Sequence, residues 1–318
     1  MASKTLPKLP VIDLSLREDL RPGTRTWESM CKEVCNALEE YGCFVIICNQ
    51  VSLNLHSEIY SAVQDLFNLP SEIKQQKPAH RGDWPIGRSY SYGPKHERID
   101  TENLTTLEGA QSFTKLMWPS GNDQFCKSAH EMSKIMMNLD QTVMRMVFQN
   151  YGAEKYYDSH IQSTDYVTGS ARYKESETNE NYLGLLGHTD KSFSTVNHQN
   201  GVSGLEIQTR DEQWILYDPP SHSSFIYLAS DAFKAWSNGR IRSCYHRVIM
   251  GGKKIRFALL CTTLHKGTVI SVPDELVDEE HPLRYKPFNH REYRKLHIEY
   301  GSKKIEYSIE AHCGVTGV

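Results

Sequence analysis

The stretch GLEIQTRDEQWILY, residues 204–217, indicates the fold class of this chain. Apolar and polar residues alternate over Gly204–Thr209, a polar turn follows at Arg210-Asp211, and Gln213–Tyr217 is again apolar and aromatic. Successive side chains of a β-strand point to opposite faces, so this pattern predicts two short strands, Gly204–Thr209 and Gln213–Tyr217, separated by a turn.

Short segments of the same kind recur on both sides of these two strands. The chain contains turn-forming pairs such as Asn200-Gly201 and Gly251-Gly252 between them. Many short strands at this spacing indicate a β-sandwich or barrel from about residue 168 onward. The further predicted strands are Ser170–Lys174, Ser192–Val196, Ser224–Leu228, Ser243–Met250 and Ile255–Thr262.

The N-terminal half contains amphipathic helices instead. Apolar residues recur at helical spacing from Trp27 to Leu38, and Gly42 can end this helix in a left-handed conformation. Ser52 is a candidate N-cap for a second helix, which stops at Pro70. The fold class is therefore mainly β with flanking α-helices. Further helices are predicted at about 123–149 and 289–298, and strands at 9–14 and 43–48.

Residues 75–122 form a segment of weak periodicity that is rich in Gly, Pro, Ser and charge. We predict that this segment is a long loop that covers a site. The chain then divides into a helical N-terminal region, 1–165, with strands that join the core, and a core over 166–318 that ends in a helix. We expect the two parts to form one compact unit.

The bulk composition excludes several classes of function. The net charge is −3, so no overall positive field favours nucleic acid or an anionic membrane. No apolar run reaches the length of a membrane span, and the first residues contain no apolar segment of a secretory signal. The eight cysteines form no CxxC pair, which is typical of free thiols in a reducing compartment and predicts a cytoplasmic protein.

Two potential metal ligands stand one residue apart in His188-Thr189-Asp190. On a strand or at its end, residues i and i+2 point to the same face, so the imidazole and the carboxylate can meet at one point. His246, in another predicted strand, can supply a third ligand. Two histidines and one carboxylate leave three positions open on Fe(II). With 14 histidines in the chain, the motif alone is weak evidence, and His246 alone is more often an ordinary half-buried side chain.

Arg256 strengthens the prediction of an iron enzyme. It follows His246 by ten residues, and its apolar neighbours predict a partly buried strand in which an arginine needs a partner. A guanidinium binds a carboxylate through two parallel hydrogen bonds, so Arg256 can hold the distal carboxylate of 2-oxoglutarate. The alternatives are a metal-dependent hydrolase or isomerase, which needs no such clamp, and a non-catalytic binding protein on the same fold.

The order of these motifs resembles that of the plant soluble 2-oxoglutarate/Fe(II)-dependent dioxygenases. The resemblance covers nearly the whole chain and extends to Leu9–Leu14 and Glu39–Phe44. Phe113–Pro119 is similar to the branch that contains the AOP-type enzymes and the deoxypodophyllotoxin synthases. The ordered core motifs are Gly187–Asp190, Gly204–Ile207, Trp214-Ile215, Ala235–Arg240, His246–Val248 and Arg256.

This resemblance implies a double-stranded β-helix, or jelly-roll, core and iron ligation by His188, Asp190 and His246. It also implies that Arg256 and Tyr173 bind 2-oxoglutarate, with O₂ as the second co-substrate and ascorbate supporting activity. One departure is Ala258, because the usual Arg-x-Ser is Arg-Phe-Ala here, so one hydroxyl donor to the co-substrate is missing.

The expected reaction is oxidation of a small plant specialised metabolite by hydroxylation, ring closure, desaturation or demethylation, with release of succinate and CO₂. We expect a monomer that binds neither nucleic acid nor membrane. Five aromatic residues are candidates for an apolar substrate pocket, although each is more often plain core. They are Phe113, Trp118, Phe193, Phe225 and Tyr227.

Overall fold

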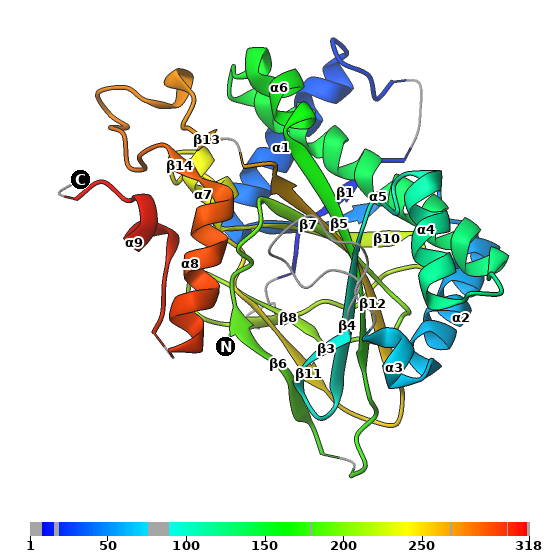
Figure 1. Cartoon of the computed structure of the whole chain (residues 1–318). Coiled ribbons are helices and arrows are strands. Elements are labelled where there is room, and N and C mark those ends of the chain that lie inside the picture. The colour runs from blue at the N-terminus through cyan, green and yellow to red at the C-terminus, as the bar shows by residue number, and fades with distance from the viewer. Residues whose placement is uncertain are drawn as a thin grey trace, which may run out of the picture.

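The computed structural model describes residues 8–15, 19–75, 89–178, 180–267, 269–303 and 305–316. Two β-sheets dominate this part of the chain (Figure 1). Neighbouring strands in both sheets are antiparallel, except for the first two strands of the larger sheet, which are parallel. The larger sheet has the order β1 (Val11–Asp13), β2 (Cys43–Ile47), β10 (Ser224–Ala229), β7 (Ser194–Gln199), β12 (Arg256–His265), β5 (Thr164–Tyr173), β4 (His96–Glu102) and β3 (Ser89–Gly93).

The smaller sheet has four strands, and a short pair lies apart from both sheets. Its order is β6 (Tyr182–His188), β11 (His246–Met250), β8 (Leu205–Gln208) and β9 (Trp214–Leu216). The separate pair is β13 (Val269–Ile270) with β14 (Phe288–Asn289). The two strands predicted within residues 204–217 are confirmed as β8 and β9, which pair in antiparallel register.

Helices cover the larger sheet and the C-terminal side. Thr24 caps the first helix with its side chain, and Gly42 ends that helix with φ +71°, as expected. The helices are α1 (Arg25–Tyr41), α2 (Leu53–Asn68), α3 (Ser71–Lys74), α4 (Leu107–Met117), α5 (Asp123–Asn150), α6 (Tyr157–Gln162), α7 (Asp231–Trp236), α8 (His290–Ser302) and α9 (Ile309–Cys313), with short 3₁₀ turns at Glu154–Tyr156 and Asp274–Leu276.

The larger sheet is apolar on both faces, and each face contributes to a different core. On β12, Phe257 and Leu259 pack against the helices, in one cluster with residues of α1, α2 and α5. Ala258 points the other way, into a second cluster with Leu205 and Val248 of the smaller sheet. The two sheets therefore face each other across a buried interior, which is the expected jelly-roll arrangement, and the helices lie outside it.

The interpretation of 75–122 as a loop is wrong for most of its length. Strands β3 and β4 and helix α4 occupy 89–93, 96–102 and 107–117, and β4 pairs along its whole length with β5. Polar residues such as Arg98 and Asp100 on the face toward the interior concealed the alternation that marks a strand. Residues 76–88 lie outside the described ranges, and the covering role of the segment stays a prediction.

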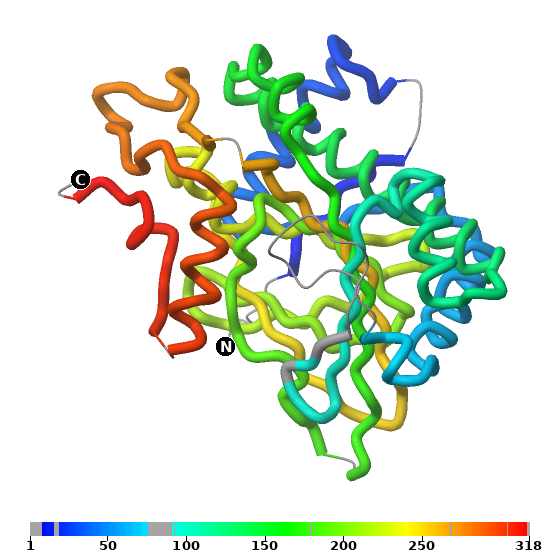
Figure 2. The backbone as a smooth tube through the Cα atoms, in the orientation of Figure 1, coloured from blue at the N-terminus to red at the C-terminus, as the bar shows by residue number. Residues whose placement is uncertain are grey.

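The C-terminal helix α8 packs beside the segment that follows β6. Figure 2 shows α8 running beside the segment that follows β6, and His290 hydrogen-bonds to the backbone carbonyl of Lys191 at 2.8 Å. Within the described ranges, no helix combines the length and the apolar character that a membrane span requires.

Candidate metal centre

Three predicted ligands converge where the smaller sheet meets the interior. His188 ends β6 and pairs across the sheet with His246, the first residue of β11. Asp190 follows two residues later, and its Oδ1 lies 3.5 Å from Nε2 of His188 and 4.0 Å from Nε2 of His246. One donor atom from each of the three residues lies within 4.8 Å of the other two. The structure therefore brings the whole predicted set together.

Backbone carbonyls fix the orientation of both imidazoles. Nδ1 of His188 lies 2.8 Å from the carbonyl of Leu186, and Nδ1 of His246 lies 3.1 Å from that of Cys244. A carbonyl only accepts, so each Nδ1 must carry the proton and each Nε2 has its lone pair directed at the shared point. This arrangement is the usual outer-shell support of a metal-binding histidine.

The carboxylate is oriented in the same way. Thr195 on β7 donates its hydroxyl to Oδ2 of Asp190 at 2.9 Å, which leaves Oδ1 facing the imidazoles. Burial raises the pKa of Asp190, but the adjacent His188 and His246 outweigh burial and hold this pKa below its ordinary value. Two imidazole nitrogens and one ionised carboxylate oxygen form a donor set that fits Fe(II).

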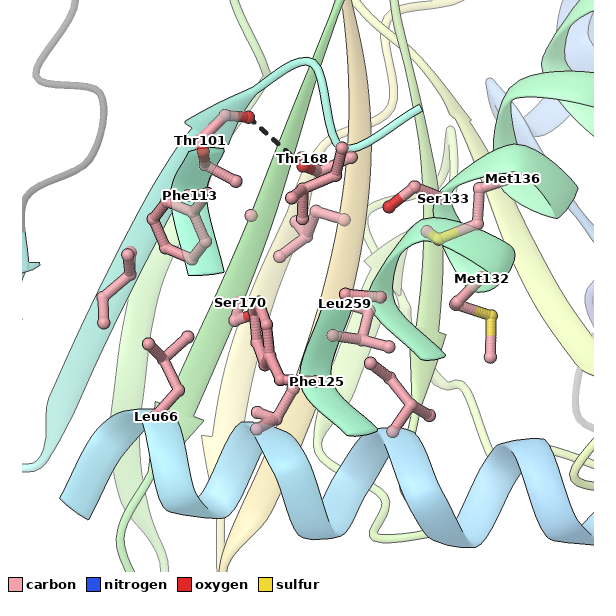
Figure 3. A pocket seen from close by; sticks show the side chains of 17 residues that line it. Leu66, Thr101, Phe113, Phe125, Met132, Ser133, Met136, Thr168, Ser170 and Leu259 are labelled. Carbon is pink, nitrogen blue, oxygen red and sulfur yellow. Dashed lines mark hydrogen bonds between the residues drawn. The ribbon is translucent and has the colours of Figure 1, made fainter. Parts of the chain in front are cut away.

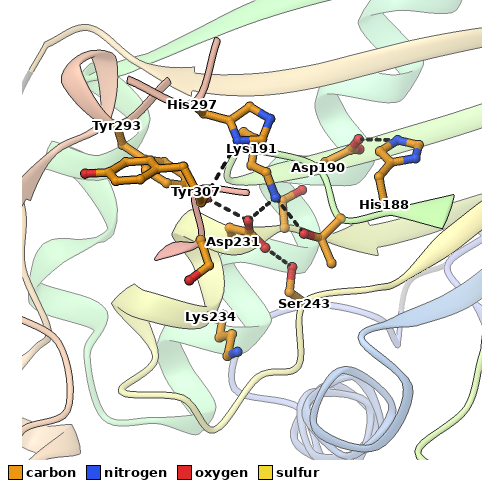
Figure 4. A network of polar contacts seen from close by, with 12 residues as sticks. His188, Asp190, Lys191, Asp231, Lys234, Ser243, Tyr293, His297 and Tyr307 are labelled. Atoms are coloured by element: carbon orange, nitrogen blue, oxygen red, sulfur yellow. Dashed lines mark hydrogen bonds and ion pairs between the residues drawn. The ribbon is translucent and has the colours of Figure 1, made fainter. Parts of the chain in front are cut away.

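A buried polar network holds the turn that carries Asp190 (Figure 4). Lys191 donates to Thr189 Oγ1 at 2.8 Å and to Oδ2 of Asp231 at 2.6 Å. Asp231, at the start of α7, also accepts hydrogen bonds from Ser243 and from Tyr293 of α8. The backbone N–H of Asp231 donates to the carbonyl of Asp190 at 3.0 Å. The network ties α7 and α8 to the metal-binding turn.

Arg256 lies at the start of β12, on the face toward the interior, and is 1% exposed. Its Nε and Nη2 both donate to Oε1 of Gln199, and its Cζ lies 5.0 Å from the centre of the Tyr173 ring. Burial lowers the pKa of Arg256, against the opposing effect of nearby tyrosines. Among the described residues, no carboxylate forms an ion pair with this guanidinium, so a buried cation faces the interior with only neutral protein partners.

Two further sequence predictions concern the surroundings of Arg256. Tyr173 is 4% exposed and pairs directly with Arg256 across β5 and β12, so the structure brings these two residues together. Ala258 lies two residues further along the same face, with a buried methyl group where the resembling family has a hydroxyl.

The five aromatic candidates for a substrate pocket lie in a different part of the molecule. All of them belong to, or pack against, the cluster between the larger sheet and the helices, on the face away from the metal centre. Phe225 and Tyr227 alternate on β10 with Ile226 and Leu228, and it is the latter pair that faces the interior. The structure therefore places Phe113, Trp118, Phe193, Phe225 and Tyr227 in or against the helix-side core, and their contact with a substrate stays a prediction.

Phe113 lines a small cavity in that helix-side core (Figure 3). The cavity lies between α2, α4, α5 and the larger sheet, and its volume of about 20 Å³ has space for roughly one water molecule. Apolar side chains such as Leu66, Phe125 and Leu259 surround it. The cavity is a packing gap in the core and is too small for a metabolite.

Sequence reasoning missed four residues that support the centre: Lys191, Thr195, Gln199 and Asp231. Lys191 directly follows the His-x-Asp motif, and this position was the one feature of the sequence that could have indicated its role at the metal centre. The alternation of Thr195 and Gln199 along a strand places both on one face, but the sequence does not say that this face looks inward.

Comparison with known proteins assigns the chain to a family. The model of the 2OG-Fe(II) oxygenase superfamily matches residues 144–263, and that of the N-terminal region of non-haem dioxygenases in morphine synthesis matches 9–109. A probable 2-oxoglutarate-dependent dioxygenase AOP1 of Arabidopsis thaliana is 37% identical, over 90% of this chain and 95% of its own length. The 2-oxoglutarate-dependent dioxygenase AOP3 of the same plant is 28% identical over 98% of both chains.

Solved structures agree with this assignment. The dioxygenase for auxin oxidation from rice has a TM-score of 0.81 and 25% identity, and the match covers 97% of this chain and all of that one. The first superfamily match includes all three converging ligands and Arg256. The chain therefore belongs to the 2OG-Fe(II) oxygenase superfamily and is a 2-oxoglutarate-dependent dioxygenase of the plant AOP-like branch.

Proposed function

We propose that His188, Asp190 and His246 bind the catalytic Fe(II) and that Arg256 binds the distal carboxylate of 2-oxoglutarate. The observation that carries this assignment is the convergence of the three ligand atoms on the same interior as a buried arginine with only neutral protein partners. A hydrolase or isomerase on this fold has no use for such an arginine, and a non-catalytic protein has no need to keep all three ligands.

Bound iron, with 2-oxoglutarate and O₂, supplies an oxidant for a substrate C–H bond, and the co-substrate leaves as succinate and CO₂. The protein supplies geometry. The carbonyls of Leu186 and Cys244 hold the imidazoles, Thr195 holds the carboxylate, and Arg256 sets the direction in which the co-substrate lies. The apolar residues packed around Arg256 keep water away from its guanidinium.

The substrate is a small plant specialised metabolite, in line with the AOP enzymes and the auxin-oxidising enzyme that this chain resembles. Strand β4, between β5 and the edge strand β3, carries the ion pair of Arg98 with Asp100. Arg98 and Asp100 pair across the sheet with Ala171 and Gly169, so they lie on the inward face of β4. We therefore infer a substrate with polar or charged groups in place of the purely apolar one that the aromatic candidates indicated.

The remaining expectations also become proposals. We propose a cytoplasmic enzyme, supported by eight free cysteines that are all buried. We propose a monomer, because one chain contributes every residue of the site. The contacts of α5 with β7 and β12 support the expectation that the N-terminal region and the core form one compact unit. Sedimentation analysis of the purified protein tests the monomer.

The direct test is succinate release by anaerobically purified protein given Fe(II), ascorbate, 2-oxoglutarate and then air. A panel of apolar, neutral polar and anionic plant metabolites is supplied as substrates. We expect iron-dependent succinate that rises with a polar or anionic compound. If the protein binds neither Fe(II) nor 2-oxoglutarate, the assignment of the site fails, whereas a response only to apolar compounds overturns the inference on substrate polarity.

A further inference from the structure

The inward face of β7 connects the two ends of the proposed site. Thr195 at one end holds Asp190, and Gln199 at the other end accepts hydrogen bonds from Arg256. Four residues at about 3.3 Å each separate these positions by roughly 13 Å along the strand. A dicarboxylate that reaches from the metal to Arg256 must therefore lie along this strand.

Gln199 has an unused hydrogen-bond donor at the Arg256 end. The side chain is 2% exposed, and its Nε2 is buried without a partner among the described residues. The orientation of the amide is fixed, because a guanidinium has only donors and the atom that faces Arg256 must be the carbonyl oxygen. Nε2 therefore points away from Arg256, and a buried donor left in this way is costly unless a ligand satisfies it.

The place where a hydroxyl is missing lies directly beside this donor. Ala258 pairs with Gln199 across β12 and β7, and directly paired residues of neighbouring strands share one face of the sheet. Arg256 is two residues away on the same face. The position of the missing serine hydroxyl and the unpaired Nε2 of Gln199 therefore lie side by side near Arg256.

We propose that Nε2 of Gln199 donates a hydrogen bond to the distal carboxylate of 2-oxoglutarate, in place of the hydroxyl that Ala258 lacks. This inference rests on the proposed role of Arg256. Gln199 then has two functions: its carbonyl holds the guanidinium, and its amide nitrogen binds the same carboxylate. The co-substrate is a suitable partner because its carboxylates only accept hydrogen bonds.

The test is a double-mutant cycle with Gln199→Met and Ala258→Ser, read out as 2-oxoglutarate affinity. Calorimetric titration of anaerobic, Mn²⁺-loaded protein measures binding without turnover. We expect Gln199→Met to weaken binding by about 10-fold or more, because a hydrogen bond to a charged group is lost. Ala258→Ser alone should change affinity by less than about 3-fold, but should restore about 5-fold or more in the Gln199→Met background.

Several outcomes overturn the inference. Unchanged affinity in Gln199→Met removes the role of the amide. An equal gain from Ala258→Ser in both backgrounds means that the hydroxyl position is vacant in the natural protein and that Gln199 only positions Arg256. Mn²⁺ affinity and thermal unfolding of each variant show whether the fold is intact. Arg256→Met separates the two proposals, since unchanged 2-oxoglutarate binding in that variant refutes the proposed site itself.

Discussion

Replacing Asp231 with asparagine tests whether the network behind the metal-binding turn matters. The carboxylate is 4% exposed and is the acceptor for Lys191, Ser243 and Tyr293. An Asp231→Asn side chain has the same size but no charge, so the ammonium of Lys191, whose side chain is 21% exposed, loses its counter-ion.

Removing one partner of a buried ion pair costs about 3–5 kcal/mol, and the partial exposure of Lys191 favours the lower end. Unfolding a chain of 318 residues has an entropy of roughly 0.7 kcal/mol/K, so a loss of about 3 kcal/mol lowers the melting temperature by about 4–5 °C. Because the same network holds the turn that carries Asp190, we also expect Mn²⁺ affinity to fall by about 10-fold.

Differential scanning calorimetry of the metal-free protein and a calorimetric Mn²⁺ titration measure the two effects. Glu275→Gln is a matched control, because Glu275 forms an equally short ion pair with Lys155 at the surface, where we expect no comparable loss. A melting temperature within 1 °C of the parent and unchanged Mn²⁺ affinity would falsify the reasoning. A lower melting temperature with unchanged Mn²⁺ affinity would mean that the network stabilises the fold but does not position the metal ligands.

Three further predictions concern single residues. Asp190→Ala should abolish Mn²⁺ binding and succinate release while the circular dichroism spectrum stays that of the parent; activity in the purified variant contradicts the ligand assignment. Asp140 is fully buried, and burial raises its pKa to about 6 from 3.8 despite three hydroxyl donors. The folded state therefore holds the proton on Asp140 more tightly than the unfolded state does. As pH rises from about 4 to 6, the free energy of unfolding of the protein falls by about 3 kcal/mol. Asp140→Asn should remove that slope from denaturant unfolding measured across this range, and an unchanged slope refutes it. Gly42→Ala should lower the melting temperature by several degrees, because φ is +71° and the new Cβ would lie 2.4 Å from the carbonyl of Arg242; a neutral result refutes the strain.

The sequence was sufficient where a pattern is local. Helices α1, α2 and α5 were predicted within a few residues because their apolar positions repeat with the helical period and their caps are recognisable. The strands β8 and β9 were predicted from short β-favouring segments on both sides of a polar turn. The two-residue spacing of His188 and Asp190 indicated that both side chains can point to one place.

The sequence was insufficient where the environment of a strand matters. β4 was missed because its inward residues are charged, and β6, which carries His188, was not among the predicted strands. Alternation divides a strand into two faces but does not say which face meets the helices and which meets the other sheet. In the larger sheet both faces are apolar, so the sequence did not show that Phe225 and Tyr227 belong to the core on the helix side.

The sequence by itself determined the chemistry of this protein: the identity and order of three metal ligands, a distant arginine, and a mainly β chain with flanking helices. Only the tertiary structure decided which neutral groups surround Arg256, that Thr195 and Gln199 share the inward face of β7, and that Lys191 is held by Asp231 and α8. The physical reason is that ligand identity belongs to single residues, whereas burial and hydrogen-bond partners arise from strand pairing between segments far apart in the chain.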